Sequence, residues 1–300
     1  MRLSAAPLNT STSSHVVTRF APSPNGLLHA GHALAAFTAF ELAQRHGGRF
    51  LLRIEDIDTA RARPEFVEAI YQDLAWLGLT WEQPVLVQSQ HFQEYFAAAE
   101  RLIAQGLLYP CFATRSEIEA AADPANLDPD GAPIYPGLWK SAPADAIASR
   151  MMAGENPAPR LDMAAALSAV RAKLSDAPLT FTERDEHGQS TVVVASPERW
   201  GDAVIVRKDV PASYHLAVVV DDARQGVTHV TRGQDLLAAT DLQRLLHVLL
   251  DLPEPVYSHH RLIRWADGRK LSKSSGDMGL RSLRNEGAKA EDLRQAIGVG

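Results

Sequence analysis

Residues 16–32 read VVTRFAPSPNGLLHAGH, and this stretch decides the fold. A β-rich run at 15–20 is halted by turn-forming residues at 22–26, and apolar residues then recur at helical spacing over 30–45. Gly47 and Gly48 end that helix, and 50–54 (FLLRI) is typical of a short buried strand. Strand, turn, helix and strand in this order predict the βαβ unit of a parallel sheet.

The rest of the chain continues this α/β pattern with one interruption. The spacing of apolar residues predicts helices at 64–77, 91–105 and 234–250, and short strands at 191–195, 203–207 and 214–221. Of these strands, 214–221 (YHLAVVVD) has the strongest pattern of a buried strand. Residues 120–159 are rich in Ala, Pro, Asp and Gly with weak periodicity, which predicts an insertion or irregular subdomain.

Composition limits the classes of protein that this chain can belong to. Its 300 residues, 46% hydrophobic and 22% charged, are typical of a globular protein of about two domains. The net charge of −6 means that any binding to nucleic acid must be local. No run approaches the ~20 apolar residues of a spanning helix, so no membrane partner is expected. Residues 1–15 are predicted to be a disordered tail, and the single cysteine, Cys111, favours a reducing, cytoplasmic setting.

Two histidines stand at the predicted strand-to-helix corner. His29 and His32 are three residues apart, and Gly31 between them permits close approach of a ligand to the backbone. Helix amides and imidazole donors at such a corner suit the phosphates of a nucleotide. For an isolated H-x-x-H, capping and packing of the first helical turn is the more common explanation.

Two further clusters carry charge. Glu55, Asp56 and Asp58 follow the strand at 50–54, where carboxylates could hold an ammonium group or Mg²⁺, although such clusters are often solvated turns or caps. Lys270 and Lys273 lie in DGRKLSKSSG (267–276), a cationic loop that could close over a polyphosphate; a solvated basic loop is the alternative. The histidine pair, the acidic cluster and the lysine loop occur in this order along one chain, and together they favour a nucleotide site.

HAGH resembles the HIGH motif, and KLSKS the KMSKS motif, of class I aminoacyl-tRNA synthetases. RFAPSPNGLLHAGH and LLRIEDID narrow the resemblance to the glutamyl branch, and QSQHFQEYFAAAERLIAQGLLYPC, GDAVIVRKDVPASYHLAVVVDD and QGVTHVTRGQDLL agree with it. The resemblance covers most of 16–275. It implies an α/β fold with a Rossmann-type parallel sheet and an inserted α+β subdomain.

The resemblance also implies a division of the chain into parts. These are the tail at 1–15, the two halves of the catalytic domain at 16–110 and 201–262, an inserted acceptor-binding-like subdomain at 111–200, and the KLSKS loop with a helical segment at 263–300. Full glutamyl-tRNA synthetases continue far beyond this loop into an anticodon-binding domain, whereas few residues follow Ser274 here. We therefore expect no anticodon-binding domain.

A catalytic region without an anticodon-binding domain resembles the truncated paralogues of glutamyl-tRNA synthetase. Members of this group activate glutamate with ATP and attach it to the queuosine base at the wobble position of tRNA(Asp). Val218, where glutamyl-tRNA synthetases usually carry asparagine, supports this group. Two alternatives stay open: a catalytic fragment that charges the tRNA 3′ end, and a synthetase-like binding protein without catalysis.

The resemblance assigns roles to individual residues. Glutamate has two carboxylates and one ammonium, so its pocket needs arginines and an acid. The implied glutamate-binding residues are Arg19, Phe20, Ala21, Pro22, Ser23, Glu55, Tyr214 and Arg232. The implied catalytic residues are His29, His32, Lys270 and Lys273, and those that contact ATP, bound with Mg²⁺, are His29, Gly31, His32 and Lys273. We expect a monomer that takes L-glutamate, ATP and queuosine-containing tRNA(Asp).

One departure concerns zinc. Members of the family often bind a structural zinc in the inserted region through C-x-C followed by Y-x-x-x-C. The matching positions here are Cys111, Ala113, Tyr135 and Trp139. Because two surviving ligands do not close a tetrahedral site, we expect no zinc and a small apolar cluster in its place.

Overall fold

The computed structural model describes residues 15–210, 212–263 and 279–299. Its first half is the expected βαβ unit, in which β1 (Val17–Phe20), β2 (Arg49–Ile54) and β3 (Leu86–Val87) pair in parallel in that order. Helices α1 (Ala30–Arg45) and α2 (Pro64–Trp76) make the crossovers. The 3-10 turn η1 (Gln88–Gln90) and helix α3 (Phe92–Ala104) follow. The predicted strands and helices of this half are confirmed.

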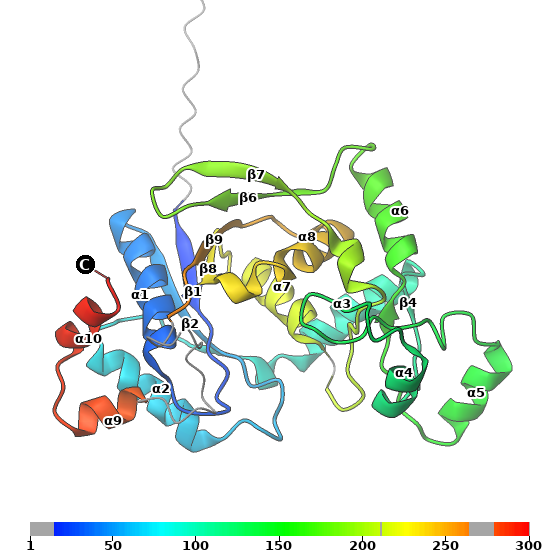
Figure 1. Cartoon of the computed structure of the whole chain (residues 1–300), viewed down its shortest axis with the longest axis horizontal. Helices are drawn as coiled ribbons and strands as arrows, with labels where there is room; N and C mark the ends of the chain where they lie inside the picture. The colour runs from blue at the N-terminus through cyan, green and yellow to red at the C-terminus, as the bar shows by residue number, and fades with distance from the viewer. Residues whose placement is uncertain (1–14, 211, 264–278, 300) are drawn as a thin grey trace, which may run out of the picture.

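The second half extends the sheet on the other side of β1. The strand order there is β7-β6-β9-β8, formed by β6 (Thr180–Arg184), β7 (Ser190–Val194), β8 (His229–Gly233) and β9 (Val256–His260). Among these four strands, β6 and β7 pair in antiparallel fashion, and β6–β9 and β8–β9 pair in parallel. The Thr228 amide donates to the Val17 carbonyl over 3.0 Å, so β8 lies beside β1. Figure 1 shows β8, β9 and β1 side by side.

Helices cover the sheet on both faces. Successive residues of a strand point to opposite faces, and Leu51 accordingly packs in one buried cluster while Leu52 packs in another. The cluster around Leu51 includes residues of α3, α6 (Met163–Lys173), α7 (Tyr214–Arg224) and α8 (Ala239–Leu249). The cluster around Leu52 includes α1, α2 and the C-terminal helices α9 (Leu280–Asn285) and α10 (Ala290–Ala296).

The inserted region projects to one side (Figure 1). It contains β4 (Leu108–Tyr109) paired antiparallel with β5 (Arg160–Leu161), and helices α4 (Arg115–Ala121) and α5 (Ala144–Met152). Residues 122–143 have only turns and bridges, as expected, but the weak periodicity missed α5. The 3-10 turn η2 (Pro197–Trp200) follows β7 and leads toward α7.

Three predictions of secondary structure are wrong. Residues 214–221 are not a strand: they form most of helix α7, whose N-terminus is capped by the Ser213 hydroxyl, which accepts from the Leu216 amide over 3.4 Å. The β-branched run lies between α3 and α8, where tertiary packing outweighs strand propensity. Residues 203–207 form an extended loop with a single bridge at Val204. The helix predicted at 234–250 is divided into η3 (Gln234–Leu236) and α8.

Candidate active site

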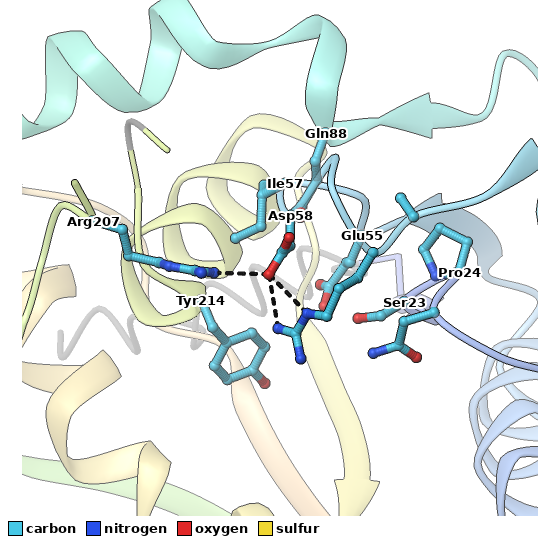
Figure 2. Close-up of a pocket in the computed structure, with 11 residues that line it drawn as sticks. Ser23, Pro24, Glu55, Ile57, Asp58, Gln88, Arg207 and Tyr214 are labelled. Atoms are coloured by element: carbon cyan, nitrogen blue, oxygen red, sulfur yellow. Dashed lines mark hydrogen bonds and ion pairs between the residues drawn. The ribbon is translucent and has the colours of Figure 1, made fainter. Parts of the chain in front are cut away.

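A pocket of about 150 Å³ opens at the carboxyl ends of β1 and β2 (Figure 2). Because both strands are parallel, the segments that follow them meet at one edge of the sheet. Ser23 comes from the turn after β1, Glu55 follows β2, and the ring of Tyr214 comes from the first residue of α7. The structure therefore brings together three of the predicted glutamate-binding residues, which lie far apart in the sequence.

A buried network of charges supports this pocket. Arg53 has no exposed surface, and its guanidinium lies 2.8 Å from Asp222 and 3.3 Å from Glu55. Arg19 donates to the same Asp222 oxygen over 3.0 Å, and also to the Thr231 carbonyl. Arg19 thus holds the floor of the site instead of lining the cavity.

The second carboxylate of this network, Asp221, is held by neutral donors. Gln88 donates to it over 2.8 Å and the Tyr95 hydroxyl over 2.9 Å, while the Arg53 Nε lies 3.8 Å away. Arg19 and Arg53 therefore face three carboxylates, those of Asp221, Asp222 and Glu55. A ligand with an ammonium group would supply the missing positive charge, and Glu55 is the carboxylate that lines the cavity.

The pKa values follow from this arrangement. Burial alone would raise the pKa of Asp222, but the guanidiniums of Arg19 and Arg53 outweigh it and hold that pKa below its usual range. Burial raises the pKa of Glu55, and the same two arginines offset that effect only in part. An ammonium placed against Glu55 would stabilise the ionised carboxylate, so binding of such a ligand is linked to the charge of this group.

Arg232 lies on β8, away from this cavity. Its guanidinium donates to Gln243 and Thr240 over 2.7 Å each and to His259 over 3.1 Å. It also lies over the Tyr257 ring, 5.3 Å from the ring centroid. The structure therefore places Arg232 in a buried polar network on the strand next to Arg19.

The remaining residues predicted in the first turn shape the corner. The Phe20 side chain is buried in the cluster around Leu52, so it belongs to the core and does not line the cavity. The Pro22 carbonyl accepts from the Glu55 amide over 3.0 Å, which ties the turn to the end of β2. Ala21 lies between them and is partly buried.

His29 and His32 form a reciprocal cap at the start of α1. The Gly31 amide donates to the His29 Nδ1 over 3.1 Å, and the His29 amide donates to the His32 Nδ1 over 3.1 Å. Capping is thus what the structure shows, and it fixes the tautomer: since each Nδ1 accepts, the proton sits on Nε2. An Nε2–H group is a donor of the kind that phosphate oxygens accept from, so capping through Nδ1 and phosphate binding are compatible.

Lys270 and Lys273 lie outside the described residues. The described chain resumes at Gly279, which bridges to His29, and the Leu280 amide donates to the Leu28 carbonyl over 2.8 Å. The segment that follows the KLSKS motif is therefore hydrogen-bonded directly to the HAGH corner.

Two further charged groups line the pocket: Asp58, which sequence reasoning included in the acidic cluster after β2, and Arg207, which it missed. Asp58 accepts from Arg61 over 2.9 Å and lies 3.3 Å from Arg207, as the dashed lines in Figure 2 show. Arg207 lies in the segment GDAVIVRKDVPASYH, but only the fold shows that it reaches the acidic turn. The neighbouring Asp56 accepts from the amide and hydroxyl of Ser89, so its role in the described structure is to hold a turn.

The four positions of the zinc pattern lie together. Cys111, Ala113 and Tyr135 form a buried cluster, and Trp139 packs against it. The Tyr135 hydroxyl accepts from the Cys111 thiol over 3.4 Å and from the Trp139 amide over 2.8 Å. Within the described ranges, no group of three or more His, Cys, Asp or Glu side chains is arranged to hold a metal ion.

The βαβ corner, the parallel sheet and the acidic pocket at its carboxyl edge define the catalytic domain of a class I tRNA synthetase. Residues 15–298 match the family described as "tRNA synthetases class I (E and Q), catalytic domain". A protein of Rhodobacter capsulatus named "Glutamyl-Q tRNA(Asp) synthetase" is 44% identical over 298 residues, which span 95% of this chain and 100% of the relative. The chain belongs to this class I family and, within it, to the glutamyl-Q tRNA(Asp) synthetases.

Longer relatives share the same catalytic region. "Glutamate--tRNA ligase 2" of Rhodospirillum rubrum is 40% identical over 282 residues, 94% of this chain but 56% of that protein. The crystal structure of glutamate-tRNA synthetase from Elizabethkingia anophelis superposes with a TM-score of 0.69 at 26% identity, over 91% of this chain and 54% of that one. In the part of the chain that the structure describes, no helix is long and apolar enough to cross a bilayer.

Proposed function

We propose that this protein activates L-glutamate with ATP in the absence of tRNA and then transfers the glutamate to the queuosine base at the wobble position of tRNA(Asp). The observation that carries the proposal is the 44% identity to a glutamyl-Q tRNA(Asp) synthetase over the whole of that relative. The charge balance of the pocket supports it, because three carboxylates face two guanidiniums where an amino acid's ammonium would bind.

Each residue has a proposed role in glutamate binding. Glu55 receives the ammonium group, and Ser23 and Tyr214 line the same cavity. Arg19, which Asp222 holds beneath the cavity, and Arg232, in the polar network on the next strand, are proposed to supply positive charge for the carboxylates from behind the lining residues. Phe20, Ala21 and Pro22 shape the corner. Glutamine would present a neutral amide to a guanidinium and leave that charge unpaired, which gives a basis for its rejection.

ATP is proposed to bind at the HAGH corner with its Mg²⁺. The Nε2 donors of His29 and His32 contact phosphate oxygens, Gly31 admits the nucleotide, and Lys270 and Lys273 stabilise the departing pyrophosphate. The glutamate α-carboxylate attacks the α-phosphorus in line, and pyrophosphate leaves. A hydroxyl of the queuosine cyclopentenediol then attacks the carbonyl of the adenylate and releases AMP.

Several other expectations stand as part of this proposal. We propose that the protein is a zinc-free cytoplasmic monomer, because only Cys111 and Tyr135 of the zinc pattern remain. We also propose the division into a tail at 1–15, catalytic halves at 16–110 and 201–262, an insertion at 111–200 whose strands β6 and β7 join the catalytic sheet, and the KLSKS region at 263–300.

The test is ATP–pyrophosphate exchange with glutamate in the absence of tRNA, followed by transfer of labelled glutamate to tRNA(Asp) with and without queuosine. Exchange without tRNA and transfer to the queuosine-containing tRNA alone would support the proposal. The 40% identity to a glutamate–tRNA ligase favours charging of the tRNA 3′ end as the second candidate. Exchange that required tRNA(Glu), with the product at the 3′ end, would establish that candidate. No exchange at all would indicate a binding protein.

A further inference from the structure

A second cavity, of about 560 Å³, adjoins the glutamate pocket. Tyr214 and Arg207 line both cavities, so the two share a wall. The volume falls within the range of about 300–1,000 Å³ found for small-molecule sites. None of the roles proposed above uses this space, although the second half of the reaction needs a place for the group that accepts glutamate.

One wall of this cavity is aromatic. Trp200 of η2 and Tyr214 and His215 of α7 line it. The Trp200 and His215 rings are 4.9 Å apart edge to face, and the Trp200 indole is fixed by donating to the Ala238 carbonyl over 3.2 Å. Rigid aromatic rings of this kind stack on nucleobases.

His215 adds a polar atom to that wall. Burial lowers the pKa of His215 to about 4, so the ring is neutral at physiological pH. Its Nδ1 is buried and has no hydrogen-bond partner among the described residues. A buried polar atom without a partner is costly, and the polar edge of a base would satisfy it.

The inserted region also lines this cavity, with three carboxylates and with the guanidiniums of Arg115 and Arg160. Glu119 lies on α4, and Asp128 and Asp130 follow in the next loop. Asp128 fixes that loop by accepting from the amides of Asp130 and Ala132 over 2.9 Å each. Within the described ranges, none of these three carboxylates, which we call the acidic wall, forms an ion pair with Arg115, Arg160 or another cation, so all three are available to a cationic ligand.

We propose that this cavity receives the queuosine nucleoside, with its base against Trp200 and His215 and its cationic side chain against Glu119 and Asp130. The inference rests on the proposed function, which supplies the acceptor. Queuosine carries a secondary amine on the same cyclopentene ring as its diol, and that amine is protonated at neutral pH. The placement requires the diol, on the same ring as the amine, to reach the glutamate pocket past Tyr214 and Arg207, which line both cavities. Arg115 and Arg207 at the cavity suit the phosphates of the RNA strand.

The acidic wall makes a specific prediction: it selects queuosine over unmodified guanosine. The test variant is Glu119→Gln with Asp130→Asn, and the matched control is Glu100→Gln with Glu186→Gln, two exposed acids that do not line the cavity. Both variants remove two negative charges, so any general gain in RNA affinity is the same in each. The substrate is the tRNA(Asp) anticodon stem-loop with queuosine or guanosine at the wobble position.

We expect the KM for glutamate transfer to the queuosine stem-loop to rise about five- to tenfold in the cavity variant and to stay unchanged in the control. Glutamate-dependent exchange without RNA should be unaffected in both variants. Direct binding should show a preference for queuosine over guanosine in the parent and the control, and none in the cavity variant. Equal KM values in the two variants, or equal weakening for both stem-loops, would overturn the inference.

The aromatic wall is tested separately with His215→Leu, which should weaken binding of both stem-loops by about fivefold and leave the queuosine preference intact. Unchanged binding would overturn the placement of the base. The proposed function and this inference fail in different ways. If the parent shows neither exchange nor transfer, the proposed function fails, and the binding measurements still decide the cavity. If the parent transfers glutamate and the cavity variant matches the control, only the inference fails.

Discussion

Asp222→Asn should cost far more stability than the loss of any exposed carboxylate. Asp222 is 4% exposed and accepts from Arg19 over 3.0 Å and from Arg53 over 2.8 Å. Loss of one partner from a buried ion pair costs about 3–5 kcal/mol, because the remaining charges stay buried and uncompensated. With a urea m-value of about 3 kcal/mol/M, the midpoint of unfolding should fall by about 1 to 1.7 M.

The matched control is Glu82→Gln. Glu82 and Arg49 form an ion pair at 2.7 Å whose side chains are 43% and 50% exposed. Solvent screens that pair, so its loss should cost about 0–1 kcal/mol, or about 0.3 M at most in the midpoint. Equal shifts for the two variants would refute the argument that burial of the network sets its energy.

The stability cost of Asp222→Asn should also depend on pH in a defined direction. Although burial would raise the pKa of Asp222, Arg19 and Arg53 hold it below its usual value. The contribution of Asp222 is therefore fully present at neutral pH and is lost as the pH falls through that lowered pKa. The difference in unfolding free energy between parent and Asp222→Asn should shrink only in strong acid. A difference that disappeared near pH 6 would contradict this assignment.

Three further predictions follow from other parts of the molecule. Asp73 is fully buried and burial raises its pKa to about 6, so the parent should lose about 2 kcal/mol of stability as the pH rises from 4 to 7. Asp73→Asn should abolish that slope in urea titrations, and parallel slopes for parent and variant would contradict the assignment. His29→Asn keeps a side-chain acceptor for the helix cap but removes the Nε2 donor, so stability should change by less than about 0.5 kcal/mol. The kcat/KM for ATP–pyrophosphate exchange should fall about 100-fold, and exchange at the parent rate would exclude a phosphate role for His29. The double variant Ala113→Cys with Trp139→Cys should bind stoichiometric zinc, because the four positions of the zinc pattern lie together. Elemental analysis should find zinc in this variant and none in the parent. No zinc in the double variant would show that the cluster does not have ligand geometry.

Several features of the site could be predicted from the sequence because they are local. The βαβ corner depends on the turn residues at 22–26 and on helical spacing over 30–45, and α1 begins and ends where that spacing predicts. Glu55 follows β2 directly, so its place at the carboxyl edge follows from the strand assignment. The spacing of His29 and His32 likewise fixes their position in the first turn.

Other features depend on contacts between distant segments. Residues 214–221 have the composition of a strand, but Ser213 caps a helix there and the packing of α3 and α8 decides the outcome. Arg207 reaches Asp58 across 149 positions of sequence, and no local pattern indicates that contact. Arg232 was expected at the pocket, yet its partners on α8 and β9 hold it in a separate polar network.

The sequence by itself determined the class of protein, because the two motifs and the parallel-sheet pattern depend on short segments whose chemistry is set by residue type and spacing. Only the tertiary structure decided which charges share the buried site. Asp222 joins Arg19 and Arg53 because a helix from the second half of the chain packs against the ends of two strands from the first. Charges interact strongly only over a few ångströms away from water, and that proximity is a property of the folded chain.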